Sequence, residues 1–312
     1  MRSRLLLVLV LAALPLTLGL AACGGDDNSS GLSGTIKADG SSTVGPLTEL
    51  AAEKFKEENS DVNVTVGISG TGGGFEKFCA KEIDIADASR PIDTKEEVPV
   101  CKKNGVAYDD VQVANDGIAL VVNPDNDWAT CLTTDQLKKI WDKGSNVKNW
   151  NQVDPKFPDQ SMKLYGPGTD SGTFDFFTEQ INGEKGRSRS DYSATEDDNV
   201  TVQGVSGDKG ALGYFGLSYA EENPDKVKIV QVDSGNGCVT PSTKTVQDGT
   251  YKPLSRPLFI YPSVSALKRK EVDGFVKFYV DNSEDYAKQA KFVPMTSEQL
   301  TKAKETATKI AG

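Results

Sequence analysis

Three stretches of glycine and hydroxyl residues have the composition of a site for a small anion. They are Gly40-Ser41-Ser42-Thr43, Ser69 through Gly74, and Asp170-Ser171-Gly172-Thr173, and each lies where a strand pattern gives way to a helix pattern. The start of a helix offers unpaired N–H groups and about half a positive charge, and glycine lets an oxyanion approach that backbone closely. Helix capping alone would explain any single stretch. Three stretches at strand ends of one sheet favour a shared ligand site.

A cation follows the second of these stretches. The strand pattern at Ile83-Asp84-Ile85 runs out into Ser89 and Arg90 before a proline, and the planar guanidinium of arginine suits a tetrahedral oxyanion. An ion pair between Arg90 and an acidic residue is the alternative. None of the stretches matches the GxxxxGK[ST] or strand-GxGxxG fingerprints, so nucleotide phosphates are not indicated.

Strands alternate with helices along the chain, which predicts the α/β class with a mostly parallel sheet. A short helix is expected around Phe75 to Cys79, and the polar residues 183–198 are expected to form a surface loop. The other strand patterns cover residues 34–38, 62–68, 162–165, 212–215 and 227–232, and the other helix patterns cover residues 46–58, 134–142, 173–181, 272–279 and 297–310.

Two apolar stretches predict a division into two lobes. Residues 111–123 are apolar for longer than a mean strand and can take the chain out of a first domain, to which residues 254–261 can return it. With 312 residues the chain is long enough for two cores. We therefore predict a lobe I of residues 34–118 and 256–312, a lobe II of residues 119–255, and a cleft between them.

The first residues indicate export. Arg2 and Arg4 precede an apolar run that ends at Ala22, which is typical of a secretory signal, here residues 1–22. The small residues before Cys23 resemble the lipobox of bacterial lipoproteins, in which the cysteine is lipidated. Cys23 is then an anchor on the extracytoplasmic face of the cell membrane, and residues 23–33 are a flexible tether. A secreted protein without lipid is the alternative.

The other cysteines, Cys79, Cys101, Cys131 and Cys238, are even in number in a compartment that permits disulfides. Three connectivities are open, and in one of them Cys79 and Cys101 close a short local loop. A metal site is not indicated, because no pair has CxxC spacing and the chain has no histidine. No cofactor is expected.

Composition excludes other classes. Without histidine, Ser-His-Asp and Cys-His catalysis cannot operate. The formal net charge of −10 argues against nucleic acid as a partner.

The chain is expected to act as a monomer.

From Ile36 to its C-terminus the chain resembles the phosphate-binding lipoproteins of the high-affinity phosphate ABC transporter, the PstS family. The resemblance implies a type II periplasmic-binding-protein fold that closes on one inorganic phosphate and delivers it to the permease subunits, with no bond made or broken. The motifs that support it span both predicted lobes: "ADGSSTVGPLTE", "GISGTGGGFEKFCAKEIDIADASRPI", "ANDGIALVVNP", "LYGPGTDSGTFDFF" and "ALGYFGLSYA".

The resemblance also suggests roles for single residues. Thr43 and Val44 correspond to the first phosphate loop of the family, Thr71 to the hydroxyl of its glycine loop, and Ser171-Gly172-Thr173 to its SGT loop. Together with the reading of the residues themselves, this gives a set of expected phosphate contacts: Ser42, Thr43, Val44, Thr71, Gly72, Ser89, Arg90, Asp170, Ser171, Gly172 and Thr173.

The chain departs from the family pattern at two positions. Pro167 stands where some members have an arginine, and Ser89 stands where some have an aspartate that accepts the proton of monohydrogen phosphate. An ionised carboxylate favours phosphate over sulfate, because it accepts a bond from the first and repels the second. The candidates for this proton acceptor are Asp170, Asp116 and Asp87.

Three other functions remain open. The nearest is a binding protein for sulfate or molybdate. Another is a secreted phosphoryl-transfer enzyme with Ser42 or Ser171 as nucleophile, although the sequence has no histidine and no clear cluster of metal-binding carboxylates. The last is a structural or adhesive surface lipoprotein.

Overall fold

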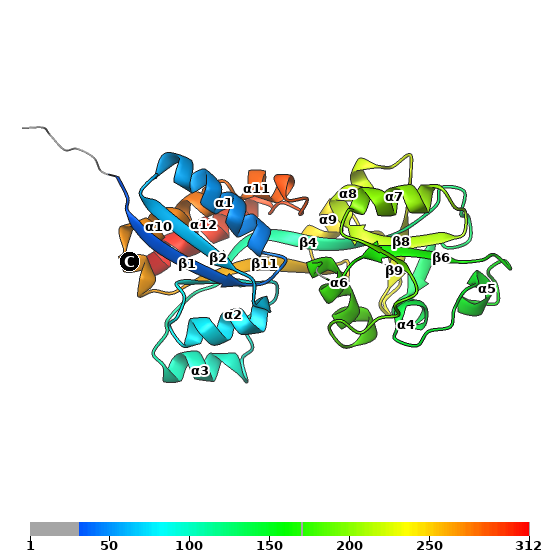
Figure 1. The fold of residues 1–312 in the computed structure, drawn as a ribbon, viewed down its shortest axis with the longest axis horizontal. Helices are drawn as coiled ribbons and strands as arrows, with labels where there is room; N and C mark the ends of the chain where they lie inside the picture. The colour runs from blue at the N-terminus through cyan, green and yellow to red at the C-terminus, as the bar shows by residue number, and fades with distance from the viewer. Residues whose placement is uncertain (1–30, 170, 312) are drawn as a thin grey trace, which may run out of the picture. The chain divides into compact units, whose positions relative to one another are not determined.

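The computed structural model describes residues 31–169 and 171–311, and from Leu32 the chain forms one compact unit. Helices and strands alternate around a mixed sheet, which confirms the predicted α/β class (Figure 1). The predicted signal peptide, Cys23 and Asp170 lie outside the described residues, as does most of the predicted tether.

Buried apolar side chains gather in clusters, and we name the lobes after them. Lobe I packs on the cluster that includes Ile36, Phe55 and Phe275 and on a smaller cluster around Phe75 and Phe78. Its elements are β1 (Gly34–Gly40), α1 (Gly45–Glu58), β2 (Val62–Gly67), α2 (Gly70–Cys79), β3 (Ile85–Ala88), α3 (Glu97–Lys103), η2 (Ala266–Lys268), α10 (Lys270–Asp281), α11 (Ser283–Gln289) and α12 (Ser297–Ala311).

Lobe II packs on the cluster that includes Leu120, Trp141 and Phe215. Its elements are β5 (Cys131–Thr133), α4 (Thr134–Trp141), α5 (Trp150–Val153), β6 (Lys163–Pro167), α6 (Gly172–Phe177), the π-helix η1 (Thr178–Asn182), β7 (Ser193–Thr195), α7 (Asp198–Ser206), β8 (Ala211–Gly216), α8 (Leu217–Glu222), β9 (Lys228–Asp233), β10 (Cys238–Val239) and α9 (Thr243–Gln247).

Strands β4 (Val111–Val122) and β11 (Ser255–Pro262) run side by side between the lobes (Figure 1). They pair antiparallel, with Asp116 opposite Arg256 and Asn115 opposite Pro257. They occupy the two apolar stretches that were expected to cross between domains. The exact lobe boundaries at 118/119 and 255/256 stay a prediction.

The sheet is mixed, and the expectation of a mostly parallel sheet was wrong. Its strand order is β2-β1-β3-β11-β4-β8-β6-β7. β1 pairs parallel with β2 and β3, and β6 pairs parallel with β7 and β8. The crossing strands instead run antiparallel to their neighbours, because each carries the chain toward the other lobe.

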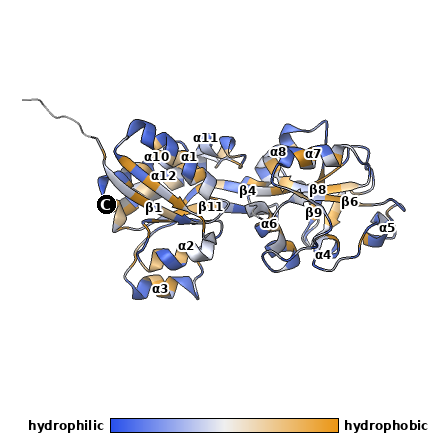
Figure 2. Ribbon diagram, in the orientation of Figure 1, coloured by the Kyte–Doolittle hydropathy of each residue, from blue (hydrophilic) through white to orange (hydrophobic). Residues whose placement is uncertain are grey.

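Helices cover both faces of the lobe I sheet. In β3, Ile85 is buried in the cluster with α1 and α10, whereas Ala86 is buried in the cluster with Phe75 and Phe78 of α2, as the alternation of a strand requires. Helices α2, α3 and α7 carry both hydrophilic and hydrophobic residues (Figure 2), so each can bury one side against its lobe.

The glycine run forms the first turns of a helix, not a loop before one. Helix α2 begins at Gly70, earlier than expected. A Cβ on Gly74 would lie 2.6 Å from the Cα of Gly40 at the end of β1. Glycine is therefore required for the start of α2 to approach the end of β1 this closely.

The cysteines form one of the connectivities left open by the sequence. Cys79 bonds Cys101, which joins α2 to α3, and Cys131 bonds Cys238, which joins β5 to β10. The first bridge lies inside lobe I and the second inside lobe II, so neither restrains the movement of one lobe against the other.

Candidate functional site

Loops from both lobes meet around a cavity of about 440 Å³. The described residues of the three glycine and hydroxyl stretches lie at junctions between a strand and the start of the helix that follows it: β1 and α1, β2 and α2, and β6 and α6. The cavity is lined by seven of the predicted contact residues among those described: Ser42, Thr43, Thr71, Gly72, Ser89, Arg90 and Gly172.

The first loop is held by a buried serine. The Ser41 side chain accepts hydrogen bonds from the backbone nitrogens of Thr43, at 3.1 Å, and Val44, at 3.4 Å. These N–H groups belong to the start of α1, which begins at Gly45. The loop is thus shaped before any ligand arrives, and the Thr43 hydroxyl faces the arginine described below.

The glycine loop is held by Asp39 at the end of β1. Asp39 accepts bonds from the backbone and hydroxyl of Ser69, at 3.1 and 2.5 Å, and pairs with Lys77 at 2.5 Å. Burial opposes ionisation of Asp39, but Lys77 and Ser69 outweigh it and lower the pKa of this carboxyl. An ionised Asp39 therefore fixes the loop ahead of Gly70 at neutral pH.

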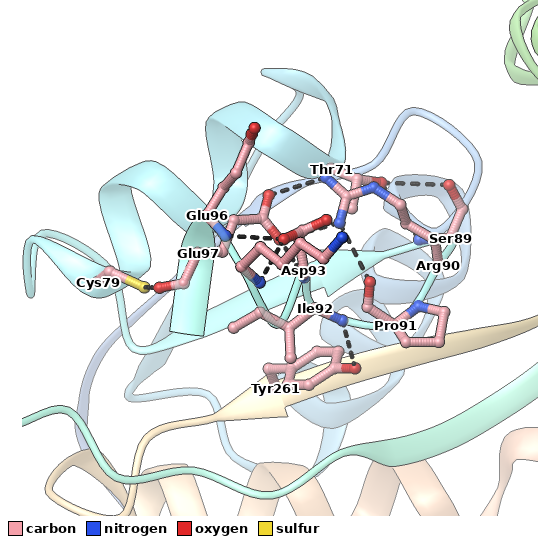
Figure 3. Close-up of polar contacts among 11 residues, drawn as sticks. Thr71, Cys79, Ser89, Arg90, Pro91, Ile92, Asp93, Glu96, Glu97 and Tyr261 are labelled. Carbon is pink, nitrogen blue, oxygen red and sulfur yellow. Dashed lines mark hydrogen bonds and ion pairs between the residues drawn. The ribbon is translucent and has the colours of Figure 1, made fainter. Parts of the chain in front are cut away.

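The end of β3 joins the glycine loop through hydroxyl groups. The hydroxyls of Thr71 and Ser89 lie 3.2 Å apart, and the Ser89 backbone nitrogen donates to Thr71 Oγ1, also at 3.2 Å (Figure 3). Hydroxyls can rotate to donate or accept, so both can turn toward a ligand in the cavity.

Gly172 brings lobe II against lobe I. A Cβ at this position would overlap Thr43 Oγ1 and would lie 3.1 Å from the Thr43 backbone nitrogen. The Ser171 hydroxyl accepts a bond from the Thr173 nitrogen at 3.1 Å and so caps α6. The start of α6 thus touches the first loop because residue 172 has no side chain.

Arg256 of β11 supplies a buried cation that sequence reasoning missed. Its Nε donates to Asp116 at 3.1 Å, its Nη2 donates to Thr43 Oγ1 at 2.9 Å, and its guanidinium stacks 3.7 Å from the ring centre of Phe176. The side chain is 12% exposed and lines the cavity. Among the described residues, Nη1 has no hydrogen-bond partner, so it is available to an anion.

Burial lowers the pKa of Arg256, and Asp116 works against this shift. A guanidinium nonetheless stays protonated in proteins. The site thus holds a permanent cation at the junction of the crossing strands, the first loop and α6.

Comparisons with known proteins agree with this architecture. A family model for the PBP superfamily domain matches residues 26–283. Protein SphX of Synechococcus elongatus is 49% identical over 271 residues, which cover 86% of this chain and 80% of that protein. Phosphate-binding protein PstS of Staphylococcus saprophyticus is 42% identical over 304 residues, 96% of this chain and 93% of that protein.

The chain belongs to the PstS family of the PBP superfamily. A crystal structure from Planctomyces limnophilus, described as a possible phosphate binding protein, is 44% identical, with a TM-score of 0.86 over 89% of this chain and 99% of that one. The predicted fold is thereby confirmed, and the PstS resemblance is confirmed as family membership.

Three residues predicted from the PstS motifs do not line the cavity with the others. Val44 is fully buried in the lobe I cluster, Ser171 caps α6 through its side chain, and Thr173 follows it in the same helix. The side chains of Val44 and Ser171 are therefore structural here. The backbone N–H groups of Val44 and Thr173 lie at the starts of α1 and α6, where they donate to the hydroxyls of Ser41 and Ser171.

Arg90 lines the cavity, but its guanidinium is held by an acid. Its Nη1 and Nη2 donate to both carboxylate oxygens of Glu97, at 2.9 and 2.8 Å (Figure 3). Its side chain is 41% exposed. The ion pair that was the alternative for Arg90 is thus present, and Arg256 is the more deeply buried cation.

The three candidate acceptors of the phosphate proton, Asp116, Asp87 and Asp170, lie in different places. Asp116 pairs with Arg256 and does not line the cavity. Asp87 is fully buried in β3 and accepts a bond from Thr48, at 3.0 Å, which in turn contacts Tyr279 in the lobe I core. Asp87 thus points away from the cavity. Asp170 lies outside the described residues.

The burial of Asp87 predicts that the free energy of unfolding falls as pH rises. Burial raises its pKa to about 7, and its Oδ2 has no partner among the described residues. An aspartate in an unfolded chain titrates near 3.9, so the folded state holds the extra proton between these values and stability falls as pH rises toward 7. We expect Asp87→Asn to remove this loss.

Urea unfolding at pH 5 and pH 8 checks the expectation for Asp87→Asn. Relative to the variant, the wild type should lose about 2 to 3 kcal/mol between these two pH values. Other carboxylates titrate in both proteins and cancel in the comparison. An equal difference at both pH values would mean that Asp87 is not protonated in the folded state.

Other charged side chains also line the cavity, and some of them form ion pairs. Lys185 pairs with Asp175 at 2.7 Å, and Glu179 adds a further carboxylate to the lining. No group of three or more possible metal ligands occurs within the described residues. The geometry therefore favours binding of a small anion through hydroxyls, helix starts and Arg256.

Proposed function

We propose that this protein captures inorganic phosphate outside the cytoplasm and delivers it to the permease of an ABC transporter. Its curated relatives include phosphate-binding proteins, at 40 to 42% identity. The proposed role needs reversible binding and no chemical step. The sequence has no histidine, so no hydroxyl of the cavity can be activated by a Ser-His pair.

The observation that carries the proposal is the placement of Arg256. A buried guanidinium is oriented by Asp116 on one side and Thr43 on the other, and it lines the cavity together with hydroxyl residues of lobe I and with Gly172 of lobe II. Its Nη1, which has no hydrogen-bond partner among the described residues, can donate a charge-assisted hydrogen bond to an oxygen of the anion. An anion bound there would contact both lobes and hold them together.

The available donors suffice for tight binding. Each hydrogen bond to a charged group contributes roughly 1.5 to 3 kcal/mol, and micromolar affinity requires about 8 kcal/mol. Arg256 and the hydroxyls that line the cavity, those of Ser42, Thr43, Thr71 and Ser89 among them, can supply several such bonds. The excess offsets the loss of ligand freedom and the ordering of side chains.

Selection of phosphate over sulfate would need a carboxylate near the ligand. Asp116 and Asp87 are engaged elsewhere, so Asp170 is the remaining candidate among the three acids named from the sequence. It adjoins Ser171 in the chain and follows the departure at Pro167. We propose Asp170 as the group that accepts the phosphate proton.

Calorimetric titration with phosphate, arsenate, sulfate and molybdate tests the assignment. We expect phosphate to bind in the micromolar range or tighter, arsenate to compete with it, and sulfate and molybdate to leave the heat signal unchanged. Asp170→Asn should admit sulfate, because the variant retains a hydrogen-bonding group without charge. Preferential binding of sulfate or molybdate by the wild type would overturn the phosphate assignment, and turnover of an aryl phosphate would indicate an enzyme.

We further propose that Cys23 is lipidated and holds a monomeric domain at the outer face of the cell membrane. The tether that follows it is rich in glycine, serine and acidic residues. In the part of the chain that the structure describes, no helix combines the length and apolarity needed to span a bilayer. Mass spectrometry of the mature N-terminus tests the lipidation.

A further inference from the structure

A segment near the C-terminus connects the lobes on a side of the crossing strands that the site does not use. The segment, residues 291–299, runs from just after α11 into the first residues of α12 in lobe I. Val293 exchanges backbone bonds with Asn115 of β4, at 2.8 and 2.9 Å, and is buried in the lobe II cluster. We call this segment the clasp.

Side chains extend this connection to lobe II. The Gln247 amide at the end of α9 donates to the Pro294 carbonyl at 2.8 Å, and the Gln299 amide donates back to the Gln247 carbonyl at 3.1 Å. Asn115 donates to Pro294 at 3.3 Å and to Gln299 at 3.1 Å. The Gln299 bond therefore ties α9 of lobe II to α12 of lobe I, and the Gln247 bond ties α9 to the residues just before α12.

An ion pair adds to the same connection. Lys291 pairs with Glu222 of α8 at 2.5 Å and lies 5.9 Å from the ring centre of Tyr219. Both charged side chains are more than a third exposed, so the pair contributes little alone. The amide bonds are less exposed to solvent and are the stronger restraint.

The clasp lies opposite the phosphate cavity. Asp116 and Arg256 face each other across β4 and β11, and Asn115 and Pro257 form the neighbouring pair. Because successive residues of a strand point to opposite faces, Asn115 lies on the face away from Arg256. Another cavity, of about 320 Å³, lies on that side and is lined by residues that include Gln247 and Gln299.

We propose that Gln247 and Gln299 are positioning residues that set the balance between open and closed lobes. If the crossing strands bend so that Gly172 separates from Thr43, the lobes rotate about these strands. The same rotation must move α9 against α12 on the opposite face. The bonds of the clasp therefore favour the arrangement in which Gly172 touches Thr43. They should raise the fraction of molecules that can bind, and with it the apparent affinity.

The inference rests on the proposed phosphate binding for its effect on affinity, but not for its effect on lobe opening. The test variant is Gln247→Ala combined with Gln299→Glu. The carboxylate introduced by Gln299→Glu can still accept the bonds that Gln299 accepts from Thr296 and Asn115, but it cannot donate to Gln247. Gln231→Ala is the control, because it removes one amide bond, to Thr240, within lobe II.

Small-angle X-ray scattering and calorimetry give independent readouts. We expect the ligand-free double variant to have a larger radius of gyration than the wild type, the same radius with saturating phosphate, and a Kd for phosphate raised about 5- to 50-fold. Gln231→Ala should match the wild type in both. An unchanged ligand-free radius would overturn the clasp, even if the wild type bound no phosphate. A larger radius with unchanged Kd would overturn its link to affinity.

Discussion

Arg256→Ala is expected to weaken phosphate binding by at least about 100-fold, or about 2.7 kcal/mol. The guanidinium would donate at least one charge-assisted bond to the anion, and its loss also leaves Asp116, whose side chain is 4% exposed, as a buried negative charge without its partner. Calorimetry with phosphate measures the change. Circular dichroism checks that the variant remains folded.

Two further variants separate the loss of the Arg256 contact from the effect of leaving Asp116 without a partner and from the loss of any cation near the cavity. Arg256→Met with Asp116→Asn removes both charges, so it avoids a buried unpaired carboxylate and should still bind poorly. Arg90→Ala should cost less than about 10-fold, because Glu97 already engages that guanidinium. If Arg90→Ala proved the more damaging change, the site would be centred on lobe I and the assignment of Arg256 would fail.

Gly172→Ala is expected to raise the Kd for phosphate by about 30-fold or more with little effect on the stability of the ligand-free protein. The added Cβ would overlap the Thr43 hydroxyl and crowd the Thr43 backbone, and backbone cannot move aside as a flexible side chain can. The clash exists only where the lobes meet. Alanine is otherwise well suited to the first turn of α6.

Gly216→Ala is a matched control for the change at Gly172. It adds the same methyl group to lobe II, where the nearest atoms lie 3.9 Å away. Thermal melts and phosphate titrations should show this control to be close to wild type. Normal phosphate affinity in Gly172→Ala would show that the ligand does not require contact between the start of α6 and the first loop.

Most of the fold was predictable because long elements have clear periodic patterns. The predicted helix at residues 46–58 is α1, Gly45–Glu58, and the predicted strand at residues 111–123 is β4, Val111–Val122. Helices such as α3, α5 and α8 were not predicted, since they span at most seven residues and have too few turns for a periodic pattern. The direction of pairing in the crossing strands also depends on tertiary arrangement.

The candidate site was predictable where its sequence signals are local. The three glycine and hydroxyl stretches were recognised because each combines small and hydroxyl residues next to the end of a strand pattern. Arg256 was missed, because its partners Asp116 and Thr43 lie 140 and 213 residues away in sequence. A signal did exist: Arg256 interrupts the apolar stretch 254–261, and a charge placed in such a strand needs a partner.

Because of the Cys79–Cys101 bridge, the order of the binding pocket should depend on the redox state of the compartment in which the chain folds. Ser89 and Arg90 lie between these cysteines, so one wall of the pocket belongs to the ring that the disulfide closes. Before oxidation, that ring is an open loop with more conformations to lose. A chain held in a reducing compartment should therefore have a looser and weaker pocket, and full binding strength should appear only after export.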